Sequence, residues 1–222
     1  MEAIPNASSE LLMMLLADAR LPVAGHTQSA GLEPAVRHGL RDVPAYMRAR
    51  LSTVTRVEAA TAVVALHQLR QGLAVAPVEL AWAARTPSPA MRRTSRAQGK
   101  ALLRLARRVW PDAPAFTALG ELPSRAVVLA AIAATCGLGP RSLARLVGYD
   151  DVQTVAAAAL KLLPLDPADV ACWVHDALPG VEALSLEVAG LVDPTHIPAA
   201  GAPQIEAWAE AHARTTRRLF SA

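Results

Sequence analysis

Apolar side chains recur at steps of three and four residues along most of this chain. That spacing places them on one face of an α-helix, whereas a half-buried strand alternates apolar and polar residues. The longest stretch, from Val43 to about Leu69, predicts one long helix that begins after a capping Asp42. The same spacing predicts helices at residues 32–38, 77–84, 90–110, 124–136, 141–163, 168–178, 181–191 and 203–220.

The N-terminal part of the chain predicts a further helix and then a long loop. Ser8 or Ser9 caps a helix that should end near Arg20, and Pro22 with Gly25 then turns the chain into a loop. This segment contains no basic region of the kind that opens a signal peptide. We therefore expect a cytoplasmic protein with a mobile N-terminal segment.

The residue types agree with a helical fold. Alanine and leucine dominate, aromatic residues make up 4% of the chain, and no stretch has the pattern of a β-hairpin. A chain of 222 residues is long enough for one sizeable core. The fold class predicted is all-α, a single-domain bundle (1–222) of roughly eight to ten helices with a C-terminal tail helix.

Hydrophobic content and charge exclude several classes of protein. The longest apolar run, from Ala126 to Cys136, is too short to cross a membrane and predicts a buried helix. The net charge is only +3, without a polybasic tail, so the charge does not require a nucleic-acid partner. Cys136 and Cys172 are too few and too far apart for a disulfide framework, and we expect both to be buried.

The sequence lacks the motifs of the common catalytic and metal sites. Residues 98–101 contain Gly-Lys without the upstream glycine and the hydroxyl of a phosphate-binding loop. The six histidines are dispersed, and His175 beside Asp176 or His196 near Asp193 is typical of solvated surface pairs. We predict no catalytic residue, no metal ligand and no cofactor, and hence no enzyme.

A cationic face is predicted on the helix at residues 90–110. Five cations recur there at three- and four-residue steps: Arg93, Arg96, Lys100, Arg104 and Arg107. The opposite face carries Met91, Leu102, Leu105 and Val109. Such a face is either solvated or binds an acidic protein surface or a phosphate backbone.

One segment has the pattern of a DNA-reading helix-turn-helix. Between Ser142 and Val155, an alanine is followed four residues later by a glycine at the place of the turn. Asp150 and Asp151 would then begin the recognition helix, where contacts to phosphates and bases require donors. A helical DNA-binding regulator is the alternative function.

The long segment at residues 21–33 is richer in glycine than a simple connection requires, and such loops are often functional. It resembles the N-terminal signature of the UreF family, Leu-Pro-x-Gly-Gly-Phe followed by Ser-x-Gly-Leu-Glu. The matching residues are Leu21, Pro22, Gly25, Ser29, Gly31, Leu32 and Glu33. Ala24 and His26 stand where the family has its second glycine and its phenylalanine.

Three further blocks resemble the family in the same order. Residues 93–103 look like its arginine-rich helix ending in Gly-x-x-Leu-Leu. Residues 159–165 look like its Lys-Leu-x-Pro-Leu-Gly element, although Asp166 and Pro167 replace the Gly-Gln that follows Pro-Leu in the family. His212 and the terminal Arg218-Leu219-Phe220 are similar to its closing helix.

The resemblance implies a urease accessory protein that is an adaptor and not a catalyst. Such a protein forms a homodimer, binds the D-type (UreD/UreH) accessory protein and recruits the nickel-carrying G-type (UreG) GTPase to apo-urease. The assembled complex handles nickel. The partner-binding residues implied are those of the signature together with Arg93, Arg96, Lys100, Lys161, His212, Arg218, Leu219 and Phe220.

The C-terminal tail has two interpretations that the sequence leaves open. Arg218, Leu219 and Phe220 combine a charged fork with apolar anchors, which are residues that dominate binding energy at interfaces. Leu219 and Phe220 are equally suited to latch the tail onto the chain's own core. Both hold if a free tail docks later.

Overall fold

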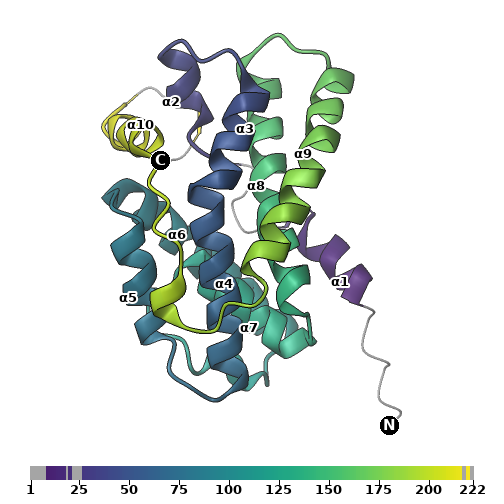
Figure 1. Ribbon diagram of the computed structural model, residues 1–222, viewed down its shortest axis with the longest axis vertical. Coiled ribbons are helices and arrows are strands. Elements are labelled where there is room, and N and C mark those ends of the chain that lie inside the picture. The colour runs from purple at the N-terminus through teal and green to yellow at the C-terminus, as the bar shows by residue number, and fades with distance from the viewer. Residues whose placement is uncertain (1–8, 19, 22–26, 217–218, 221–222) are drawn as a thin grey trace.

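The computed structural model describes residues 9–18, 20–21, 27–216 and 219–220, and these residues form helices without any strand (Figure 1). The predicted all-α class is confirmed. None of the described helices is long and apolar enough to cross a membrane. The α-helices are α1 (Ser9–Leu16), α2 (Leu32–Arg37), α3 (Val43–Ser52), α4 (Val54–Arg70), α5 (Ala76–Arg85), α6 (Pro89–Val109), α7 (Arg125–Cys136), α8 (Pro140–Leu162), α9 (Pro167–Val188) and α10 (Pro203–Ala213), with the 3₁₀ turns η2 (Pro114–Phe116) and η3 (Pro194–His196).

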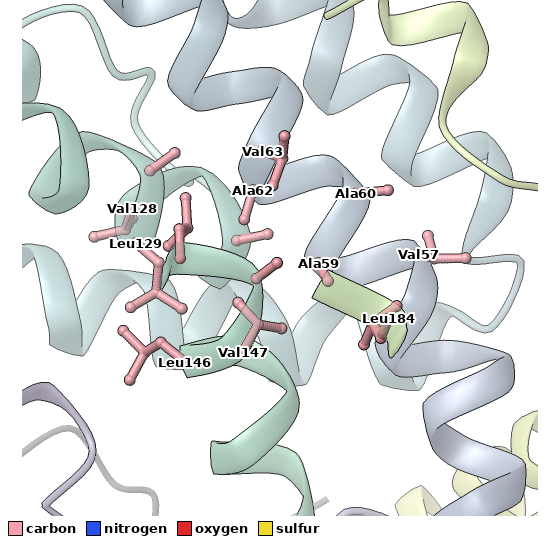
Figure 2. Close-up of a cluster of buried hydrophobic side chains, with 14 of the residues drawn as sticks. Val57, Ala59, Ala60, Ala62, Val63, Val128, Leu129, Leu146, Val147 and Leu184 are labelled. Carbon is pink, nitrogen blue, oxygen red and sulfur yellow. The ribbon is translucent and has the colours of Figure 1, made fainter. Parts of the chain in front are cut away.

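Helix α4 lies at the centre of the core. Every residue from Ala59 to Leu66 is buried, and the helix packs against α7 and α8. Small side chains such as Ala59 and Ala62 let the neighbouring helices approach closely, and larger residues fill the space between them. Figure 2 shows this cluster, in which α4 meets Val128 and Leu129 of α7, Leu146 and Val147 of α8, and Leu184 of α9.

Helix α7 is the buried helix that the longest apolar run predicts. All residues from Ala126 to Ala133 are buried, and Gly137 ends the helix in the left-handed conformation at φ 72°. Helix α6 covers one side of α7. A Cβ atom at Gly99 of α6 would lie 2.3 Å from the Pro123 carbonyl oxygen, so only glycine permits this approach.

The prediction of one helix from Val43 to Leu69 is wrong, because the helix is interrupted at Thr53. Its φ of −125° and ψ of −94° are not helical, and its hydroxyl donates a 2.6 Å hydrogen bond back to the Ala49 carbonyl oxygen. Thr61 within α4 and Thr135 within α7 make the same bond in unbroken helices, so the bond accompanies the break at Thr53 and does not by itself cause it. The apolar period continues on both sides of the break and therefore does not reveal it.

The prediction of two separate helices at residues 168–178 and 181–191 is also wrong, because the structure joins them in α9. Pro179 lies inside the helix on its exposed side. Proline removes only one backbone hydrogen bond, and the carbonyl freed at the exposed His175 is open to water. Cys172 is exposed on this helix, which corrects the prediction that both cysteines are buried, and Cys136 is half-buried.

Both terminal helices are shorter than expected. Helix α10 ends at Ala213 and not at Phe220. Beyond it, the backbone N–H of Thr215 donates to the His212 carbonyl oxygen, and the Thr215 hydroxyl donates to the Ala211 carbonyl oxygen. Helix α1 ends at Leu16, before the predicted Arg20. Pro22, Gly25 and Arg218 lie outside the described residues.

Candidate functional site

Glu33 of α2 holds the C-terminal tail. Its side chain is 1% exposed, and its two carboxylate oxygens accept the backbone N–H groups of Leu219 and Phe220 at 2.8 and 2.9 Å. Arg37 donates to the same carboxylate at 2.7 Å, and the His212 ring lies 3.7 Å from it. These donors replace the water that the buried carboxylate oxygens have lost.

The signature residues before Glu33 shape the start of α2. Gly31 precedes the helix with φ 76°, and an added Cβ would lie 2.8 Å from the Tyr46 hydroxyl oxygen. That hydroxyl donates to the Ala30 carbonyl oxygen at 2.8 Å, and the Ser29 hydroxyl accepts the Glu33 N–H at 3.3 Å. These bonds fix the direction in which Glu33 leaves the helix, while Leu32 is fully buried in the core.

The tail inserts one ring and leaves its neighbour outside. Phe220 is 3% exposed, and the Lys161 Nζ atom lies 5.2 Å from the centre of its ring. This is a cation–π contact between the end of α8 and the tail. Leu219 is 63% exposed. We call Glu33, Lys161, His212 and Phe220 the tail-docking site.

The structure therefore brings together residues of three predicted blocks. Ser29 to Glu33, Lys161, and His212 with Leu219 and Phe220 meet around the docked tail. The latch within the chain is the conformation observed here. Binding of a partner by these residues, and by Leu21, which is half-buried, stays a prediction.

A cavity of about 150 Å³ lies beside the tail-docking site. Ser29, Gly31 and His212 line it together with residues of α4, α6 and α8. Arg50 donates to both Asp151 carboxylate oxygens at 2.9 and 2.6 Å, and the Thr55 hydroxyl donates to Asp151 at 2.8 Å. Burial alone would lower the pKa of Arg50, but Asp151 raises it, so this buried guanidinium stays charged.

Glu58 is a further carboxyl group that lines this cavity. Burial raises the pKa of its carboxyl group, while the Trp82 indole N–H, which donates at 2.7 Å, acts in the opposite direction. The positive charge of Arg125 also lowers this pKa, but Arg125 is itself paired with Asp150 at 2.8 Å. The cavity is therefore lined by two arginines paired with aspartates and by one carboxyl group whose pKa is raised by burial.

The helix-turn-helix alternative is wrong. Helix α8 runs without a turn from Pro140 to Leu162, and Gly148 lies inside it, where an added Cβ would contact Val181 at 3.0 Å. The glycine permits close packing of α8 on α9 and does not mark a turn. Asp150 and Asp151 are engaged in the ion pairs described above.

The cationic face of α6 differs in part from the prediction. Arg93, Lys100, Arg104 and Arg107 are exposed, and Arg107 also donates to the Phe116 carbonyl oxygen at 3.4 Å. Arg96 instead turns inward, with its guanidinium 5.8 Å from the centre of the Trp82 ring. Val109, which the sequence places on the apolar face, is 48% exposed. Arg108, which the prediction did not include, is exposed on the cationic side.

The described residues contain no group of three or more histidine, cysteine, aspartate or glutamate side chains arranged to hold a metal ion. His175 lies 3.4 Å from Asp176, and both are exposed. The polar groups of the chain are engaged mainly in holding its helices and its tail together.

Comparison with known proteins places this chain in a class, the accessory proteins of urease. These proteins are not catalysts. The chain is 39% identical to the urease accessory protein UreF of Mycobacterium sp. (strain JLS), over 94% of this chain and 97% of the relative. It is 37% identical to UreF of Mycobacterium bovis (strain BCG / Pasteur 1173P2), over 96% and 99%, and 36% identical to UreF of Mycobacterium marinum, over 95% and 97%. A model of the UreF family matches residues 38–177. The chain belongs to the UreF family.

Proposed function

We propose that this protein is an adaptor in the maturation of nickel urease. It binds the D-type accessory protein (UreD/UreH) and, in that assembly, recruits the G-type GTPase (UreG) to apo-urease. The observation that carries the proposal is the docked tail, in which a family block at the C-terminus meets the family signature at the other end of the chain. Family membership over nearly the whole length supports it.

The geometry of the tail indicates which of its residues a partner would contact. Glu33 fixes the backbone of Leu219 and Phe220, and the buried Phe220 ring orients the segment, so that Leu219 projects outward. An exposed leucine held rigidly by its neighbours loses little entropy on binding. The partner therefore contacts Leu219 on a docked tail.

Nickel is the cargo of the assembly in this proposal. The described residues supply no cluster of ligands for it, so the metal is held by the partners or at surfaces that form on assembly. We further propose that the chain acts as a cytoplasmic homodimer. Sizing of the purified chain alone tests the dimer, and a monomeric mass at micromolar concentration would contradict it.

The decisive experiment is co-expression with the D-type protein of the same organism, followed by affinity capture and sizing. The intact chain is compared with a chain that ends before Arg218, and L219A is compared with L186A, which changes an equally apolar residue that is 58% exposed on α9. We expect the intact chain and L186A to capture the D-type protein, and the truncated chain and L219A to lose it. Equal capture by all four proteins would show that the tail is not part of the interface. Capture by none of them would contradict the adaptor function.

A further inference from the structure

Three cations form a row on the exposed face of α6. Lys100, Arg104 and Arg108 follow one another at four-residue steps and are all exposed. One helical turn separates neighbours in the row, so their side chains leave the helix about 6 Å apart. We call these three residues the cation row.

The cation row is not neutralised within the part of the chain that the structure describes. The arginine ion pairs there join Arg20, Arg37, Arg50, Arg56, Arg125, Arg141 and Arg145 to carboxylates, and no carboxylate of the described residues lies within ion-pair distance of the row. Acidic groups lie beyond its two ends. Glu210 accepts the Ala90 N–H at 2.8 Å near the start of α6, and the exposed Asp112 follows the end of the helix.

Stability of the helix does not explain the row. Cations in the last turn of a helix interact favourably with its dipole, and this accounts for Arg108. The effect falls off within one turn, and Lys100 and Arg104 lie further from the end of α6 at Val109. Three like charges at four-residue steps also repel one another, which costs a few tenths of a kcal/mol for each adjacent pair.

The surface beside the row permits close approach of another chain. Ala97 is exposed and Ala101 is half-buried on the same side of α6. Small side chains next to charged ones allow a backbone to lie near the helix while its acidic side chains reach the cations. Beyond Lys100 the exposed Arg93 extends the cationic face towards Glu210, and beyond Arg108 the exposed Asp112 follows the end of the helix.

We infer that the cation row is a docking surface for a short acidic element of a protein, with carboxylates about 6 Å apart, in the assembly that matures urease. The inference rests on the proposed function for the identity of that assembly. The surface is separate from the tail-docking site, which lies on α2, α8 and α10. The two can therefore be tested independently.

The test measures association rates of purified D-type protein, G-type GTPase and apo-urease with the chain, alone and preassembled with the D-type protein, from about 0.05 to 0.5 M NaCl. K100A/R104A/R108A is compared with the parent and with R41A/R48A/R70A, which removes the same charge from exposed positions elsewhere. For one of the protein partners we expect K100A/R104A/R108A to associate about tenfold more slowly at low salt and with a flatter salt dependence. The control variant should behave like the parent, because peripheral charges mainly steer the encounter of two proteins. Alanine has a high helix propensity, so the substitutions in α6 should not disturb the helix. Circular dichroism checks that the variants are folded.

Unchanged rates and salt dependence for all three partners would overturn the inference. If tail truncation still abolished capture of the D-type protein in that case, the proposed function would stand. A parallel titration uses a 20-base-pair duplex as the probe. Salt-steep binding of the duplex by the parent, lost in K100A/R104A/R108A, would assign the row to nucleic acid and equally overturn the inference.

Discussion

The Glu33 carboxylate and the backbone N–H of Phe220 are joined by a 2.9 Å hydrogen bond across 187 positions of the chain. One side chain of α2 thus holds Leu219 and Phe220 of the C-terminal tail against the helical core. A tail held by a few hydrogen bonds and one ring is less stable than the helical core, so it can open without unfolding the protein.

We expect E33Q to release the tail. Glutamine keeps one acceptor oxygen and places an NH₂ group against a backbone N–H, so one of the two tail bonds is lost and docking weakens by about 1–3 kcal/mol. Hydrogen exchange at the Leu219 and Phe220 amides should become faster while the core amides of α4 and α7 keep their protection. E121Q, a change at an exposed carboxylate, serves as the control. Unchanged exchange of the two tail amides would show that Glu33 does not hold the tail.

G99A should destabilise the protein by about 2 kcal/mol or more, because the new methyl group overlaps the Pro123 carbonyl oxygen and α6 must move away from the segment before α7. Urea unfolding measures the difference. The control is G120A, where nothing lies within 4 Å of the added carbon and where a gain of up to about 1 kcal/mol is expected from the stiffer unfolded chain. Equal stability of the two variants would contradict the close approach at Gly99.

D151A should be among the most destabilising single changes to a charged residue in this chain. It leaves the Arg50 guanidinium, whose side chain is 8% exposed, without its carboxylate and removes the acceptor of the Thr55 hydroxyl. A loss of about 3 kcal/mol or more in the free energy of unfolding is expected. E187A breaks the exposed pair with Arg56 and should cost less than about 1 kcal/mol. A similarly small loss in D151A would mean that water replaces the missing carboxylate.

The helices were predictable where the period of apolar residues was uninterrupted, as in α6, α7 and α8. The breaks were not. A helix ends at Thr53, where the backbone dihedral angles are not helical, and another continues through Pro179 because its exposed side tolerates the lost bond. Neither event changes the apolar period. Both depend on backbone hydrogen bonding, which the pattern of side chains does not record.

The candidate site was predictable only in part. The family blocks supplied Glu33, Lys161, His212 and Phe220, but the sequence left open whether they meet one another or a partner.

The buried ion pair between Arg50 and Asp151, which line the cavity, was missed. No sequence pattern tells which arginine pairs with which aspartate across 101 positions, because the packing of α3 against α8 brings Arg50 and Asp151 together. Helical phase on α8 does place Asp151 on the side of the buried Val147 and Val155, which was a signal that it lies inside.

E58Q should make the protein more stable at pH 7. Burial raises the pKa of the Glu58 carboxyl group, so the folded protein binds this proton more tightly than the unfolded chain does. Below the ordinary pKa of 4.5 the group is protonated in both states and costs nothing. As the pH rises from there through the raised pKa, ionisation progressively destabilises the fold, by about 1.4 kcal/mol for every pH unit that separates the folded from the unfolded pKa.

Glutamine at position 58 keeps an acceptor for the Trp82 N–H without the charge. The stability gained by E58Q, measured by urea unfolding between about pH 4 and 8, should therefore grow with pH and then level off. A gain that is constant over this range would mean that Glu58 titrates normally, and E121Q should show no gain at any pH.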